Sequence, residues 1–60
     1  MMTRKDYVET ANILNSKVDE IDFLILADLA EQFAEMFSND NERFDHQRFI
    51  DAVFADKAGN

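Results

Sequence analysis

The sequence predicts an all-α protein built from three helices. Its 60 residues contain no proline and a single glycine, Gly59, so no internal glycine is available for the tight turns of β-hairpins. Good helix formers dominate, and apolar residues recur with helical spacing, most clearly between Ile21 and Phe37. We expect one domain spanning residues 1–60, with helices at about 4–14, 20–37 and 46–57 and the middle helix central.

The small size of the chain raises the question of self-association. A chain of this length buries only about 60% of its unfolded surface, so extra buried area is valuable. With no cysteine, neither a disulfide nor a cysteine-bound zinc can add stability. Six phenylalanines and one tyrosine supply large apolar side chains instead. A self-contained three-helix unit and a helical homodimer both fit this composition.

The first helix has a clear start signal. Thr3 is the expected N-cap, and Asp6 three residues later can complete a capping box. Met2 and Tyr7 stand at the positions of a hydrophobic staple. Asn15 is the expected left-handed residue at the C-terminal end.

The other two helices repeat this pattern. Asp19 is the expected cap of the middle helix, with Val18 and Phe23 as the staple. Asp45 is the expected cap of the third helix, with Phe44 stapled onto Phe49. The expected apolar stripe of the third helix consists of Phe49, Ile50, Val53 and Phe54, and Lys57 complements the dipole in its last turn.

The apolar arc of the middle helix is unusually wide, about 200° of the circumference at 100° per residue. One flank consists of Ile25, Leu29, Phe33 and Met36, and the adjoining flank of Phe23, Leu26, Ala30, Ala34 and Phe37. Either each flank packs on one neighbouring helix, or part of the surface meets a second copy of the chain. Ile13, Ile21 and Leu24 have no obvious place inside the chain, so they form the candidate apolar interface.

Acidic residues are concentrated in the middle of the chain. The net charge is −7, and the segment from Val18 to Glu42 carries eight acidic residues and no lysine or arginine. The candidate acidic partner face on the middle helix consists of Asp28, Glu31, Gln32 and Glu35. Three interpretations remain: a solvated face that maintains solubility, a docking surface for a basic protein, or a mimic of nucleic acid that occupies a phosphate-binding groove.

The charge and hydropathy disfavour two other partners. Direct binding of nucleic acid or an anionic membrane is not expected at this negative charge. A helix-turn-helix with His46, Gln47 and Arg48 at its reading end is the weakest alternative.

The longest apolar run, Phe23 to Ala27, is far shorter than the roughly 20 residues that span a bilayer. No signal peptide is visible, so we expect a cytoplasmic protein.

The sequence shows no arrangement of residues typical of catalysis or metal binding. The single histidine, His46, has no neighbouring nucleophile and is expected to be an exposed polar residue. Acidic residues on the middle helix lack the histidine of a di-metal site. Residues 40–51 lack the glycine and the final glutamate of a calcium loop. We therefore expect no enzyme activity, no cofactor and no metal.

Two segments resemble short proteins of unknown function encoded by phages and prophages. These are MTRKDY at residues 2–7 and DNERFDHQRF at residues 40–49, which match an MTRKDY-like start and a DNxRFDxxRF-like C-terminal motif. Such relatives often carry a cysteine shortly after the second motif, whereas this chain has Ala52, Val53 and Phe54 there. The resemblance implies a phage protein inside a bacterial cell, and it transfers no functional residue.

These observations predict a small acidic, non-enzymatic protein-interaction module that self-associates. In the setting that the resemblance implies, its partner is a host or phage protein. The alternatives are a nucleic-acid mimic that inhibits a basic factor and, less favoured, a helix-turn-helix DNA binder.

Overall fold

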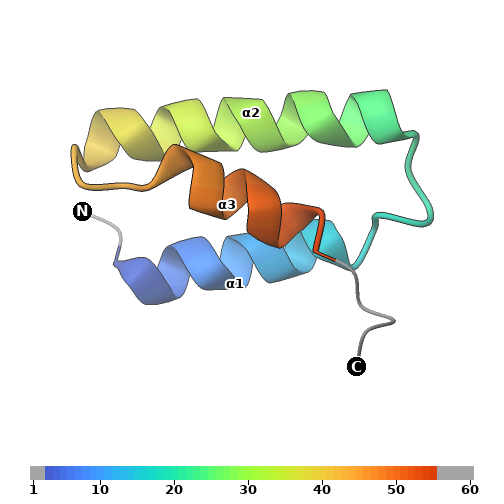
Figure 1. Cartoon of the computed structure of the whole chain (residues 1–60), viewed down its shortest axis with the longest axis horizontal. Coiled ribbons are helices and arrows are strands. Elements are labelled where there is room, and N and C mark those ends of the chain that lie inside the picture. Colours follow the sequence, from blue (N-terminus) through green and yellow to red (C-terminus); the bar gives the residue numbers. More distant parts are fainter. Residues whose placement is uncertain (1–2, 56–60) are drawn as a thin grey trace.

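Three helices make up the fold, as the sequence predicts. The computed structural model describes residues 3–55, and within that range it contains α1 (Arg4–Asn15), α2 (Phe23–Asp40) and α3 (His46–Val53) and no β-strand. Successive helices run in opposite directions, and α3 lies between α1 and α2 and packs against both (Figure 1). The short connections at residues 16–22 and 41–45 enforce this antiparallel order.

The N-terminus of α1 is fixed by the predicted pair of residues, Thr3 and Asp6. The backbone N–H of Thr3 donates to the Asp6 carboxylate at 2.9 Å, which is the reciprocal half of a capping box. The expected staple from Met2 lies outside the described residues. Tyr7 and Ala11 are buried on the inner side of the helix, as the periodicity predicts.

The prediction for the end of α1 was wrong. Asn15 is not left-handed, because no residue in the range 3–55 has a positive φ angle. The chain continues instead through right-handed turns, in which the N–H groups of Lys17 and Val18 donate to the carbonyls of Leu14 and Asn15. Asn15 is buried, and its side chain reaches across to the end of α3.

α2 begins three residues later than predicted, at Phe23. The N–H groups of Glu20 and Ile21 donate back to the Lys17 carbonyl, so this segment forms a turn of its own. The capping residue is Asp22, whose carboxylate accepts from the N–H of Leu24 at 2.8 Å. Three acidic residues, Asp19, Glu20 and Asp22, lie close together in this connection. The last of them caps α2, rather than the predicted Asp19.

This assignment predicts different effects for two aspartates in the same connection. Asp22→Ala should lower the free energy of unfolding by about 1 kcal/mol, because it removes the acceptor for an end N–H group of α2. Asp19→Ala is the matched control and should leave stability nearly unchanged. Urea unfolding followed by circular dichroism measures both. A larger loss for Asp19→Ala than for Asp22→Ala would contradict the assigned helix start.

α3 keeps its predicted start and ends earlier than predicted. The Asp45 carboxylate accepts from the N–H of Arg48 at 3.0 Å, and the rings of Phe44 and Phe49 pack with centroids 5.6 Å apart. The helix ends at Val53 rather than near Lys57, which lies outside the described residues. The carbonyls of Val53 and Ala55 accept hydrogen bonds from the Asn15 side chain, so the end of α3 is anchored on α1.

The core is formed mainly by α2. It contributes four of the eight buried hydrophobic side chains in the described chain, as a central helix should, although α3 is the helix that lies between the other two. The full set is Tyr7, Ala11, Leu26, Ala30, Ala34, Phe37, Phe49 and Val53. Small alanines on α2 allow the neighbouring helices to approach closely. Ile50 and Phe54 complete the predicted apolar stripe of α3 as half-buried contacts.

Candidate functional site

The predicted acidic partner face lies on one exposed side of α2. Asp28, Glu31, Gln32 and Glu35 are all exposed there. The Gln32 amide donates to the Asp28 carboxylate at 2.8 Å, one helical turn away. Glu35 has neither a hydrogen bond nor an ion pair to another described residue. The face therefore presents carboxylates to solvent.

Glu31 has a partner on α3. The Nε2 atom of His46 lies 2.9 Å from Glu31 Oε1, with the two side chains 45% and 57% exposed. An exposed pair of this kind contributes only about 0–1 kcal/mol. The sequence predicted an exposed His46, which is confirmed, but not this contact, because the two residues are 15 positions apart. The acidic face is thus joined at one edge to the start of α3.

The candidate apolar interface residues do not share one environment. Ile13 on α1 and Leu24 on α2 are 61% and 74% exposed. Ile21 is half-buried and packs against the core. Ile21 thus has an intrachain place that sequence reasoning did not find, whereas Ile13 and Leu24 remain on the surface.

A second exposed apolar row lies on α2 itself. Ile25, Leu29 and Met36 are 57%, 37% and 47% exposed, although all three belong to a flank expected to pack on a neighbour or a second copy. Their spacing of four and seven residues puts them on one side of the helix. In the adjoining flank, Leu26, Ala30, Ala34 and Phe37 are buried, whereas Phe23 is 63% exposed. Packing within the chain therefore leaves part of the wide apolar arc uncovered.

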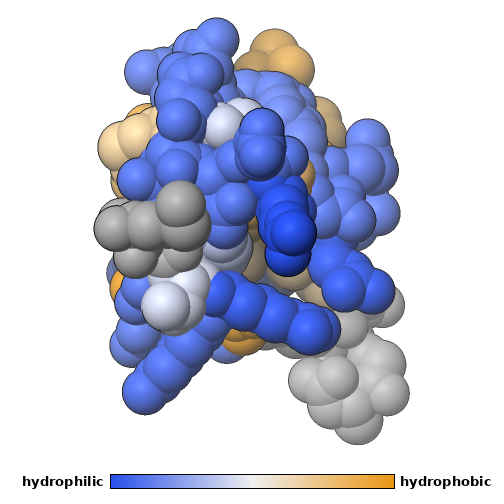
Figure 2. Space-filling view, turned by 90° about the vertical axis from the view of Figure 1, so that its left-hand side faces the viewer, coloured by the Kyte–Doolittle hydropathy of each residue, from blue (hydrophilic) through white to orange (hydrophobic). Residues whose placement is uncertain are grey.

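The apolar row and the acidic face adjoin each other on the outside of α2. At 100° per residue, Gln32 falls between Asp28 on one side and Ile25 on the other. Figure 2 looks at the end of the molecule with the 41–45 connection and shows it mostly hydrophilic, with hydrophobic surface at the upper edges, at the level of α2. We call the surface formed by Ile25, Leu29, Met36 and the four acidic-face residues the outer face of α2.

Other kinds of site find little support in the described part of the chain. Residues 3–55 contain no group of three or more histidine and acidic side chains placed to hold a metal ion. Within the same range, no helix combines the length and hydrophobicity needed to cross a membrane. Comparison of the chain with protein-family models, curated proteins and solved structures found no match.

Proposed function

We propose that this protein is a non-enzymatic interaction module that binds another protein through the outer face of α2. The observation that carries this proposal is the exposed row of Ile25, Leu29 and Met36 beside a row of carboxylates. Scattered exposed apolar residues are common, but three aligned on one helix next to one sign of charge form a binding surface. Burial of one such side chain contributes about 1.5–3 kcal/mol.

The chemistry of this face indicates the type of partner. An apolar stripe with acidic residues along one edge fits a groove or helix with an apolar strip and flanking lysines or arginines. The apolar contacts supply affinity, whereas the carboxylates mainly accelerate association and select against acidic partners. A second copy of the chain would offer its own apolar row but no basic residues, because the segment from Val18 to Glu42 contains no lysine or arginine. A homodimer through α2 would therefore rest on the apolar contacts alone. The resemblance to phage proteins adds a setting, in which the partner is a host or phage protein in the cytoplasm.

Two isoleucines provide a matched test. Ile25→Ser and Ile13→Ser remove the same group from helix positions that are 57% and 61% exposed, so neither should unfold the protein. We expect Ile25→Ser to weaken partner binding about tenfold or more, and Ile13→Ser to have little effect. Retention of the same proteins from a bacterial lysate by each immobilised variant measures heteromeric binding, and light scattering across concentration measures self-association. If only Ile13→Ser loses binding, the interface is on α1 and the proposal is wrong.

The charge of the face is tested separately. Glu35→Lys reverses an exposed acid on α2, and Glu9→Lys makes the same change on α1. Binding of a basic partner should fall and lose its salt dependence for the α2 variant only. Equal effects of the two changes would show that net charge matters rather than the outer face.

A nucleic-acid mimic is the second candidate function. It is favoured by the absence of any lysine or arginine from Val18 to Glu42, so that every charged residue of α2 is acidic. A mimic would compete with DNA for a basic DNA-binding protein, and Glu35→Lys would weaken that competition. Binding that is insensitive to salt would contradict this version, because counterion effects dominate such contacts.

A further inference from the structure

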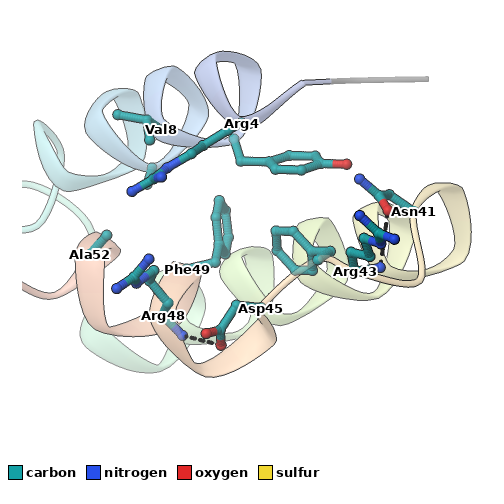
Figure 3. Close-up of a pocket in the computed structure, with 11 residues that line it drawn as sticks. Arg4, Val8, Asn41, Arg43, Asp45, Arg48, Phe49 and Ala52 are labelled. Atoms are coloured by element: carbon teal, nitrogen blue, oxygen red, sulfur yellow. Dashed lines mark hydrogen bonds between the residues drawn. The ribbon is translucent and has the colours of Figure 1, made fainter.

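A groove of about 340 Å³ separates the start of α1 from the start of α3. It is distinct from the outer face of α2 and shares no residue with it. The lining consists of Arg4, Tyr7, Val8, Ala11, Asn41, Arg43, Phe44, Asp45, Arg48, Phe49 and Ala52 (Figure 3). This volume is within the range of about 300–1,000 Å³ that is usual for ligand sites.

The groove gathers every arginine of the chain. Arg4 comes from α1, Arg43 from the 41–45 connection and Arg48 from α3. None of the three guanidinium groups has an ion pair with another residue in the range 3–55. The one carboxylate in the lining, Asp45, is occupied in capping α3. A chain of net charge −7 therefore carries a positive groove whose charges are unpaired within the described structure.

The arginines are spread along the groove rather than gathered at one point. In Figure 3 the Arg4 and Arg48 side chains extend toward one end from opposite walls, and Arg43 lies at the other end. Between them the surface is apolar, with Phe49 as part of the floor and Val8, 51% exposed, on the α1 wall. Along the groove, an apolar middle is therefore flanked by positive charge at each end.

A buried hydroxyl group in the same groove lacks a partner. Tyr7 lines the groove and is only 9% exposed, yet its Oη atom forms no hydrogen bond within the described chain. Buried polar groups are almost always paired, so an unpaired one calls for an explanation. This oxygen has almost no accessible surface, so a ligand in the groove contacts the ring of Tyr7 rather than its hydroxyl group.

The groove also unites the two segments that carry the phage resemblance. Residues 2–7 and 40–49, remote in the sequence, supply most of its lining. Helix capping accounts for Asp6 and Asp45. Capping does not account for the three arginines around one opening.

We propose that this groove binds an acidic segment of a partner protein, with a large apolar side chain over the groove and a carboxylate at each end. Guanidinium groups pair with carboxylates through two parallel hydrogen bonds, and here two such positions flank an apolar surface. A polyanion such as nucleic acid is repelled by the surrounding negative charge, whereas a short segment brings only a few charges. This site does not depend on the function proposed for α2.

A designed peptide tests the proposal directly. The probe is a fluorescein-labelled hexapeptide with a central leucine and phenylalanine between pairs of glutamates, and its binding to the full chain is followed by anisotropy. Arg43→Gln and Arg48→Gln should each weaken binding about tenfold, the usual effect of losing one charge-assisted contact. Lys17→Gln removes the same charge from an exposed residue outside the groove and should leave binding unchanged. Ile25→Ser should also leave binding unchanged, which separates this site from the α2 proposal.

A further variant addresses the apolar floor of the groove. Ala52→Phe fills the groove from an exposed position without altering charge and should abolish peptide binding while circular dichroism stays normal. Equal binding of a peptide with lysines in place of the glutamates would overturn the proposal. The proposal would also be overturned if a labelled oligothymidylate or decanoate bound more tightly than the acidic peptide. Equal losses of peptide affinity in Lys17→Gln and in the arginine variants would overturn it as well.

Discussion

Phe37→Ala should abolish cooperative folding. Phe37 is 1% exposed, and its ring meets those of Tyr7, Phe44 and Phe49 at centroid distances of 4.8, 5.4 and 5.4 Å. Truncation of a buried phenylalanine costs about 3–5 kcal/mol, through lost contacts and the cavity left behind. A domain of this size has a total stability of only about 3–5 kcal/mol. The variant should therefore show little helical circular dichroism at 25 °C and no sharp thermal transition.

Phe23→Ala is the matched control, since it makes the same change on the same helix. Phe23 is 63% exposed, and the one ring packed against it in the described chain is that of Phe54, at 5.1 Å. Its loss should cost about 1 kcal/mol or less, because little apolar area returns to water. If Phe37→Ala unfolds cooperatively with a stability within about 1 kcal/mol of the parent chain, the aromatic cluster is not the centre of the core.

Local signals in the sequence were enough to predict the three helices. Period, helix propensity and capping act over about five residues or fewer, so the Asp45 cap and the staple of Phe44 onto Phe49 could be recognised from the sequence alone. The start of α2 was misplaced because Asp19 and Asp22 satisfy the same local rule. Only the turn back to the Lys17 carbonyl decides between them, and it depends on how the connection packs.

The surfaces were harder to predict for a different reason. The wide apolar arc of α2 was visible, but which flank is exposed depends on where α1 and α3 dock, and sequence period does not encode that. Ile21 was taken as unplaced and proved to pack on the core. The groove gave no signal at all, because its arginines come from segments about 40 residues apart.

Asn15→Ala should be the most damaging alanine substitution of a polar residue in the described chain. The Asn15 amide is buried and donates to the carbonyls of Val53 at 2.8 Å and Ala55 at 3.0 Å. Removal of the amide leaves these carbonyls at the end of α3 without a donor. A buried, unsatisfied carbonyl such as that of Val53 costs about 1–3 kcal/mol, whereas the carbonyl of the exposed Ala55 can accept from water. We therefore expect a loss of about 1–3 kcal/mol in the free energy of unfolding. Hydrogen exchange in the last turn of α3 should accelerate.

Two companion variants separate this hydrogen bonding from helix propensity. Asn12→Ala makes the same change at an exposed position of α1 and should be neutral or slightly stabilising, because alanine is the better helix former. Asn15→Asp keeps the shape but replaces the donor with a buried charge facing two carbonyl oxygens, and it should cost more than Asn15→Ala. The expected order of stability is therefore Asn12→Ala, Asn15→Ala, Asn15→Asp. An Asn15→Asp protein as stable as the parent would show that the side chain does not donate to α3, and the early end of α3 would then need another cause.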